Sequence, residues 1–293
     1  MTTTTPLTKK LHLALLQFAV SSDKLANFHK VESLVSKAVK AHPNLDLIVL
    51  PECFNSPYSV KLFKKYGEDI PNGETTKFLS SLANKYQINV IGGSYPEAHH
   101  NQVFNTSTVF NKSGDLIAQH RKAHLFNIDI PNKITFQESR VLNAGDKHTQ
   151  FALPGFGSLG LGICYDLRFP ELAMMAARRG AFAMVYPGAF NTITGPLHWE
   201  ALARARAIDN QLYVVLCSPA RDLSAKYHAY GHSLVVDPMG KVIVEAGEGE
   251  ETIYCELEPE LIAETRRSIP VNEQRRFDIY KDVGDGGEIG DVV

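Results

Sequence analysis

Three side chains with complementary chemistry each follow a short apolar stretch of this sequence. Glu52 comes after residues 47–51, Lys122 after residues 116–121 and Cys164 after residues 158–163. A carboxylate can accept the proton of a thiol, the thiolate can attack a carbonyl carbon, and an ammonium can stabilise the oxyanion that forms. Together these residue types predict nucleophilic catalysis at a carbonyl group.

Each of the three residues also has an ordinary structural explanation. Glu52 could cap the segment that follows it, Lys122 could be a solvated surface charge, and Cys164 could be a small core residue. Catalysis therefore requires elements that bring the three side chains to one place.

The surroundings of Cys164 predict such an element. The apolar run before it is rich in small residues, and a helix pattern begins at Pro170. Proline suits the first turn of a helix because it lacks an N–H that would be unpaired there. A chain that turns from strand to helix holds its side chain at the mouth of a sheet, close to backbone N–H donors.

The rest of the chain alternates between strand and helix patterns. Strands are expected over residues 11–18, 47–50, 88–91, 158–163, 182–187, 212–218, 233–237, 241–245 and 252–257. Helices are expected over residues 23–41, 74–86, 170–179 and 196–210, and from residue 259. Residues 103–110 and 116–121 are expected to form an antiparallel hairpin, and residues 128–144 a long loop. The predicted fold class is α/β, with two mixed sheets inside and helices outside. In such sheets ligands bind beyond the carboxyl ends of the strands, which is where the three reactive residues occur.

No linker divides this pattern, so we expect one domain over residues 11–280. A flexible N-terminus over residues 1–10 and a Gly- and acid-rich C-terminal tail over 281–293 are expected to flank it.

Composition excludes several classes of protein. The net charge of −2 gives no electrostatic indication of a nucleic-acid or membrane-surface partner, and no apolar run is long enough to span a bilayer. The four cysteines are scattered and form no Cys-x-x-Cys pair, which favours a reducing, cytoplasmic setting over a disulfide framework. The Thr-rich start leaves a mitochondrial address open.

Three stretches resemble the motifs of the nitrilase (carbon–nitrogen hydrolase) superfamily, whose triad is Glu, Lys and Cys. They are Leu-Pro-Glu at 50–52, His-Arg-Lys-Ala-His-Leu-Phe at 120–126 and Gly-Ile-Cys-Tyr-Asp-Leu-Arg-Phe-Pro-Glu at 162–171. Further segments, at 128–131, 134–139, 186–191 and 194–200, are most similar to the omega-amidase branch. The resemblance implies a four-layer α-β-β-α sandwich, a homodimer, no metal and no cofactor. It also implies hydrolysis of the terminal amide of small keto-acid amides, alpha-ketoglutaramate and alpha-ketosuccinamate, to the keto acid and ammonia.

The resemblance also implies roles for individual residues. Glu52 would be the general base, Cys164 the nucleophile that forms a thioester, and Lys122, with the backbone N–H of Tyr165, the group that stabilises the oxyanion. Glu138 matches a second glutamate of the family and would orient Lys122 and the substrate amide.

The substrate pocket is predicted from residue chemistry. Arg168 could bind a substrate carboxylate in bidentate fashion or form a structural ion pair with Asp166. Tyr58, Phe126, Phe190 and Thr192 are candidate pocket walls. His120 and His124 have a spacing that could suit a metal, but no acid or cysteine cluster completes a site, so a structural role is expected.

Two other functions remain open on these residues. A sister amidase that acts on deaminated glutathione or an N-carbamoyl compound would share the triad and differ in the pocket. A catalytically silent binding protein with the same fold would have no physical reason to keep Glu52, Lys122 and Cys164 together.

Overall fold

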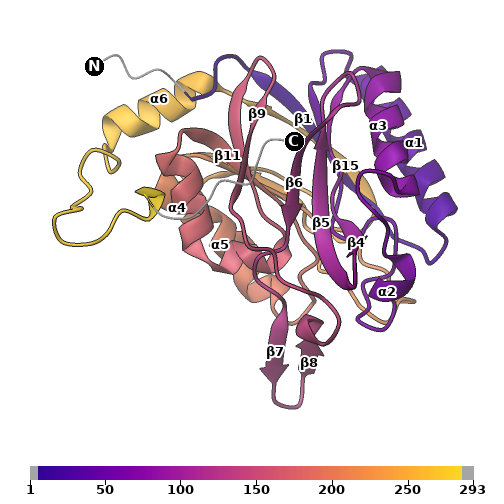
Figure 1. The fold of residues 1–293 in the computed structure, drawn as a ribbon. Helices are drawn as coiled ribbons and strands as arrows, with labels where there is room; N and C mark the ends of the chain where they lie inside the picture. Colours follow the sequence, from indigo (N-terminus) through magenta and orange to yellow (C-terminus); the bar gives the residue numbers. More distant parts are fainter. Residues whose placement is uncertain (1–5, 286–293) are drawn as a thin grey trace.

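Two β-sheets packed face to face form the centre of the protein, and helices cover their outer sides (Figure 1). The computed structural model describes residues 6–285. The first sheet has the strand order β15-β1-β2-β3-β5-β4, with β6 paired to β5. Its strands are β1 (Leu11–Gln17), β2 (Leu47–Val49), β3 (Asn89–Ile91), β4 (Tyr95–His99), β5 (Gln102–Phe110), β6 (Leu116–Arg121) and β15 (Glu251–Leu257).

The second sheet has the order β14-β13-β12-β11-β10-β9. Its strands are β9 (Thr149–Leu153), β10 (Gly157–Leu161), β11 (Ala181–Pro187), β12 (Tyr213–Cys217), β13 (Leu234–Val236) and β14 (Val242–Glu245). The inward faces of both sheets share one apolar core, in which Leu13 and Val49 of the first sheet pack with Leu161 and Val215 of the second. This core fixes the two sheets relative to each other.

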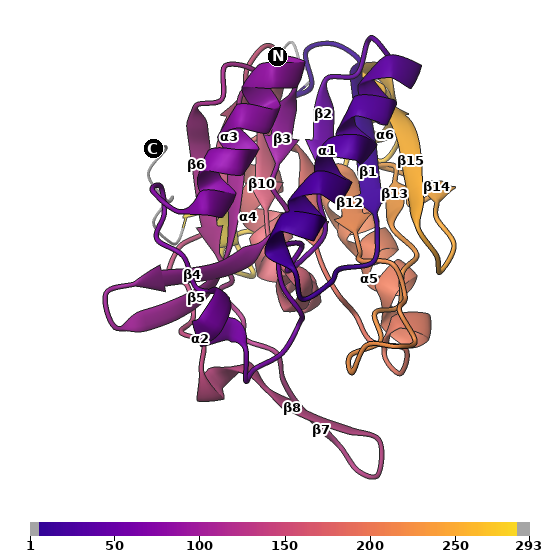
Figure 2. The ribbon, with the colours of Figure 1, turned by 90° about the vertical axis from the view of Figure 1, so that its right-hand side faces the viewer.

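Helices α1 (Lys24–Ala41) and α3 (Glu74–Tyr86) cover the first sheet (Figure 2), and α4 (Pro170–Arg178) and α5 (Gly195–Asn210) cover the second. Helix α1 begins where the side chain of Asp23 accepts the N–H of Ala26, and its buried residues Phe28, Val31 and Val35 recur at helical spacing. The remaining helices are α2 (Phe63–Tyr66), α6 (Pro259–Ser268) and the 3-10 helices η1 (Glu138–Arg140), η2 (Cys164–Arg168) and η3 (Val283–Asp285). The predicted α-β-β-α sandwich is therefore confirmed.

The chain between β6 and β9 differs from the prediction. The long loop expected over residues 128–144 instead contains the hairpin β7 (Asn127–Ile130) and β8 (Ile134–Gln137), followed directly by η1. This hairpin projects from the body of the sandwich (Figures 1 and 2). Its half-buried residues alternate with exposed ones, as expected for strands. Each strand has only four residues, so the alternation is too short to be recognised in the sequence.

Both ends of the described chain are anchored. Leu7 is fully buried and the backbone N–H of Thr8 donates to the carbonyl of Phe156, so packing begins before Leu11. Asp282 pairs with Arg178 of α4 at 2.7 Å. Residues 1–5 of the N-terminus expected to be flexible, and 286–293 of the expected tail, lie outside the described residues.

Candidate active site

Three strand ends converge on one edge of the sandwich. Glu52 follows β2, Lys122 directly follows β6 and Cys164 follows β10. Strand β2 is parallel to β3, and β6 is parallel to both because two antiparallel pairings, β3 with β5 and β5 with β6, separate it from β3. The carboxyl ends of β2 and β6 therefore point the same way.

A buried cluster of charged groups occupies this edge. The Nζ atom of Lys122 lies 3.0 Å from Oε1 of Glu52 and 3.0 Å from Oε1 of Glu138. All three side chains have no exposed surface. Because isolated buried charges are strongly disfavoured, the ammonium between two carboxylates stabilises all three groups.

The thiol of Cys164 lies close enough to the carboxylate of Glu52 for each group to shift the pKa of the other. Cys164 begins η2 and has a φ of +47°, a conformation that costs a non-glycine residue free energy. A Cβ atom on Gly188, just after β11, would lie 3.1 Å from the ring of Trp199 and 3.2 Å from Cα of Cys164, so glycine avoids tight contacts where the chain passes the nucleophile.

The surroundings set the protonation of the site. Burial raises the pKa of the Cys164 thiol well above its usual value, and the negative charge of Glu52 adds to this. Burial also raises the pKa of Glu52, against the opposing charge of Lys122. Burial alone would lower the pKa of Lys122, but Glu138 and Glu52 hold it well above the ordinary range. The resting site therefore holds a protonated thiol and an ammonium on either side of the Glu52 carboxyl group.

Two groups that hold Glu52 were not predicted from the sequence. The side-chain amide of Asn105 on β5 donates to Oε1 at 2.8 Å, and the backbone N–H of Ala189 donates to Oε2 at 2.8 Å. The carbonyl of Asn105 also accepts the N–H of Lys122 at 2.8 Å. Any residue type can donate a backbone N–H, so the sequence gives no sign of the Ala189 contact. A single asparagine within a strand pattern is likewise not recognisable as a partner of Glu52.

Aromatic rings line one side of the cluster. Tyr58 donates its hydroxyl to Oε1 of Glu138 at 2.7 Å, and Phe126 donates its backbone N–H to Oε2 of the same carboxylate at 2.7 Å. Tyr58 packs against Phe136 of β8 and against Tyr227, with ring centroids 5.4 and 4.6 Å apart. Phe136 and Tyr227 were not predicted. The base of the β7–β8 hairpin thus supplies both Glu138 and part of the apolar wall.

Comparisons with known proteins show the family of this chain. The carbon–nitrogen hydrolase family matches residues 12–267. The chain belongs to this family. It is 56% identical to omega-amidase NIT3 of Saccharomyces cerevisiae, over 94% of this chain and 97% of that protein, and 50% identical to human omega-amidase NIT2, over 92% and 96%. The crystal structure of Saccharomyces cerevisiae Nit3, a member of branch 10 of the nitrilase superfamily, matches with a TM-score of 0.87 at 52% identity and covers 94% of this chain and 99% of that one.

Arg168 of this carbon–nitrogen hydrolase lies beside the cluster, but its partner is not Asp166. Its guanidinium carbon lies 4.7 Å from the ring centroid of Phe190 and 5.4 Å from that of Tyr165, and Nη1 is 3.1 Å from Nδ1 of His198. The alternative of an Arg168–Asp166 ion pair is wrong, because both oxygens of Asp166 already face other donors.

Thr192 is exposed between β11 and α5, and within residues 6–285 it makes no hydrogen bond or ring contact with the charged groups. None of the helices in residues 6–285 is long and apolar enough to cross a membrane. Within the same residues, no group of three or more His, Cys, Asp or Glu side chains could hold a metal ion.

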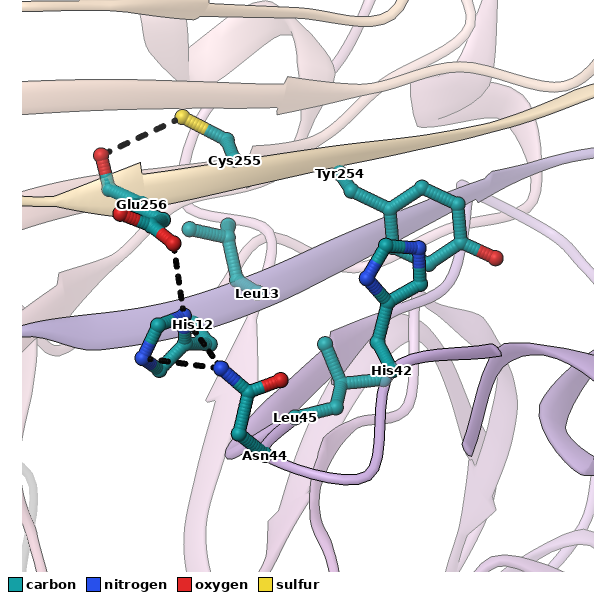
Figure 3. Close-up of a pocket in the computed structure, with 8 residues that line it drawn as sticks. All are labelled: His12, Leu13, His42, Asn44, Leu45, Tyr254, Cys255 and Glu256. Atoms are coloured by element: carbon teal, nitrogen blue, oxygen red, sulfur yellow. Dashed lines mark hydrogen bonds and ion pairs between the residues drawn. The ribbon is translucent and has the colours of Figure 1, made fainter. Parts of the chain in front are cut away.

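A separate hollow of about 250 Å³ lies where β15 pairs with β1 (Figure 3). Asn44 and Glu256 contact the ring of His12 there, and the ring of His42 packs on Tyr254 with centroids 3.7 Å apart. Neither Glu52, Lys122 and Cys164 nor Glu138 lines this hollow, so it is distinct from the candidate active site.

Proposed function

We propose that this carbon–nitrogen hydrolase is an omega-amidase that converts alpha-ketoglutaramate and alpha-ketosuccinamate to the keto acid and ammonia. The observation that carries the proposal is the meeting of Glu52, Lys122, Glu138 and the Cys164 thiol in one buried cluster. The names of the yeast and human relatives support the choice of substrate class.

In the first half-reaction, Glu52 takes the proton of Cys164 while the sulfur attacks the amide carbon. The ammonium of Lys122 and the backbone N–H of Tyr165 stabilise the oxyanion of the tetrahedral intermediate. Glu52 then returns the proton to the amide nitrogen, so that ammonia leaves and a thioester to Cys164 remains.

In the second half-reaction, Glu52 deprotonates a water molecule that attacks the thioester carbon. The carbon–sulfur bond breaks, the acid is released, and the proton returns to the sulfur of Cys164. Glu138 accepts from Lys122 and is itself fixed by Tyr58 and Phe126. It is therefore placed to orient the ammonium and the substrate amide.

Arg168 is the proposed partner of the substrate's distal carboxylate. Its Nε atom is buried without a hydrogen-bond partner in the described residues, and its guanidinium lies against Phe190 and Tyr165. A carboxylate would satisfy this donor and form a charge-assisted pair. Tyr58, Phe126 and Phe190 would form the apolar walls, and Thr192 would contribute at the rim.

We also propose a homodimer and a reducing, cytoplasmic compartment. Leu197 and Ile208 on the outer side of α5 are 66% and 49% exposed, which supports burial of this helix against a second copy. All four cysteines are free thiols, which supports a reducing setting.

The decisive experiment measures ammonia release from a panel of primary amides. Wild-type protein is expected to release ammonia from alpha-ketoglutaramate, and Cys164→Ala is expected to abolish release while keeping the fold by circular dichroism. Preferred turnover of deaminated glutathione or an N-carbamoyl compound would replace this substrate assignment with that of a sister amidase. Absence of turnover across the panel would instead favour a silent binding protein.

A further inference from the structure

Asp166 is a buried carboxylate beside the nucleophile that the mechanism above does not use. Its Oδ2 accepts the backbone N–H of Ile163 at 2.9 Å and lies 3.0 Å from Nε2 of His120. Its Oδ1 accepts the backbone N–H of His124 at 2.9 Å and lies 2.8 Å from Nδ1 of that residue. Burial alone would raise the pKa of Asp166, but the hydrogen bonds from His120 and His124 hold it well below its usual range.

The partners of Asp166 lie on the two segments that carry the catalytic groups. His120 and His124 flank Lys122 at the end of β6, which belongs to the first sheet. Ile163 precedes Cys164 beyond the end of β10, which belongs to the second sheet. One carboxylate therefore joins the segment that holds the ammonium to the turn that holds the sulfur.

The turn at Cys164 needs this support because its conformation is strained. A non-glycine residue at positive φ persists only where the surrounding contacts fix it. The backbone N–H of Asp166 donates to the carbonyl of Ile163 at 3.0 Å, which closes the turn around the nucleophile. At the far end of η2, the guanidinium of Arg206 donates to the carbonyls of Leu167 and Arg168 at 3.1 Å each.

We propose that Asp166 is a positioning residue of the amide hydrolysis. It touches neither substrate nor the reacting atoms. By accepting hydrogen bonds from both segments at once, it fixes the position of the Cys164 sulfur relative to the Lys122 ammonium. A misplacement of about 1 Å between reacting groups lowers the rate about 100-fold, so loss of this bridge is expected to reduce kcat while leaving substrate binding largely intact.

Asp166→Asn tests the proposal with little change in volume. An amide offers one acceptor oxygen where the carboxylate offers two, so one of the two bridged segments must face an NH₂ group. We expect kcat for alpha-ketoglutaramate to fall about 100-fold with little change in KM. The rate at which iodoacetamide alkylates Cys164, followed by peptide mass spectrometry, is expected to fall as well.

Asp237→Asn is the matched control. Asp237 is also a buried aspartate that accepts backbone N–H groups, those of Met239 and Lys241, but it lies in the turn between β13 and β14. If Asp166 contributes only to stability, Asp166→Asn and Asp237→Asn should behave alike. Both would then have a lower midpoint of thermal unfolding and a normal kcat per folded molecule. That result for Asp166→Asn would overturn the proposal.

A second variant decides the matter should Asp166→Asn fail to fold. His124→Phe keeps a ring that can stack on Phe169, as His124 does with centroids 3.6 Å apart, and removes only the Nδ1 contact from Asp166. A fall in kcat and in alkylation rate supports the proposal, and wild-type values for both refute it. The activity readout rests on the proposed function, whereas alkylation does not. If the wild-type protein hydrolyses no keto-amide, the proposed function is refuted. If Cys164 is still alkylated more slowly in the variants than in the wild type, the positioning role of Asp166 stands.

Discussion

Replacement of Asn105 by leucine is expected to shift the pH dependence of catalysis. The Asn105 amide donates to Oε1 of Glu52 at 2.8 Å inside a fully buried site. This hydrogen bond favours the carboxylate over the neutral acid, so its loss must raise the pKa of Glu52 further. Leucine has nearly the same volume and cannot donate.

The size of the shift follows from the strength of the lost bond. Hydrogen bonds to charged groups contribute about 1.5–3 kcal/mol, and each pKa unit corresponds to about 1.4 kcal/mol. The acidic limb of the kcat/KM profile for alpha-ketoglutaramate, which requires ionised Glu52, is therefore expected to move up by about 1–2 pH units. Because Glu52, Lys122 and Cys164 interact strongly, the limb reports the cluster as a whole.

Asn89→Leu provides the comparison. Asn89 on β3 is as buried as Asn105, at 1% exposure, and its amide donates to the carbonyl of Asp46 at 2.8 Å, away from the charged cluster. Both variants lose one buried hydrogen bond, but only Asn105→Leu should move the acidic limb. Coincident profiles for Asn105→Leu and wild type would refute the assignment of Asn105 as a support for ionised Glu52.

Two further perturbations have defined outcomes. Arg168→Gln is expected to raise KM for alpha-ketoglutaramate about 10- to 100-fold, because one charge-assisted interaction is lost. Steady-state kinetics with a neutral primary amide should show little change in KM. Equal effects on both substrates would contradict a carboxylate contact. His148 is expected to weaken the fold in acid, because burial and the charge of Arg179 lower its pKa from 6.5 to about 4. Between pH 6.5 and about pH 4, His148 is protonated in the unfolded chain but not in the folded protein. The free energy of unfolding therefore decreases by about 3 kcal/mol in total as the pH is lowered through this range. Urea unfolding of His148→Gln should show a correspondingly flatter decline, and curves parallel to wild type would disprove the role of His148.

The strands and helices were predictable where hydrophobic spacing was long and regular. Helix α3 lies where the sequence predicts it, at Glu74–Tyr86, and α1 differs from its prediction by one residue at the start. Strands β4 and β9 and the β7–β8 hairpin were missed, because each mixes apolar with polar residues over at most five positions. The equally short β2 and β13 were found because they are continuous apolar runs.

The candidate site shows a similar division. Glu52, Lys122 and Cys164 could be identified because reactive residue types follow strand patterns and the motifs resemble a known family. Ala189 acts through its backbone, and Tyr227 lies in a loop without periodicity, so neither left a pattern to detect. Arg206 and Arg204 lie on the same helix, yet Arg206 is 6% exposed and the side chain of Arg204 is 52% exposed. Only the three-dimensional packing distinguishes them.

The division of the proposed catalytic groups between two sheets is expected to make activity a reporter of folding. Glu52 and Lys122 extend from the first sheet, whereas Cys164 and the N–H of Ala189 extend from the second. Neither half of the chain contains all of these groups, so turnover is expected only once the inner faces of the sheets have docked. The recovery of turnover during refolding is therefore expected to follow the docking of the two sheets, and separately produced halves are expected to regain turnover only by reassembling the sandwich.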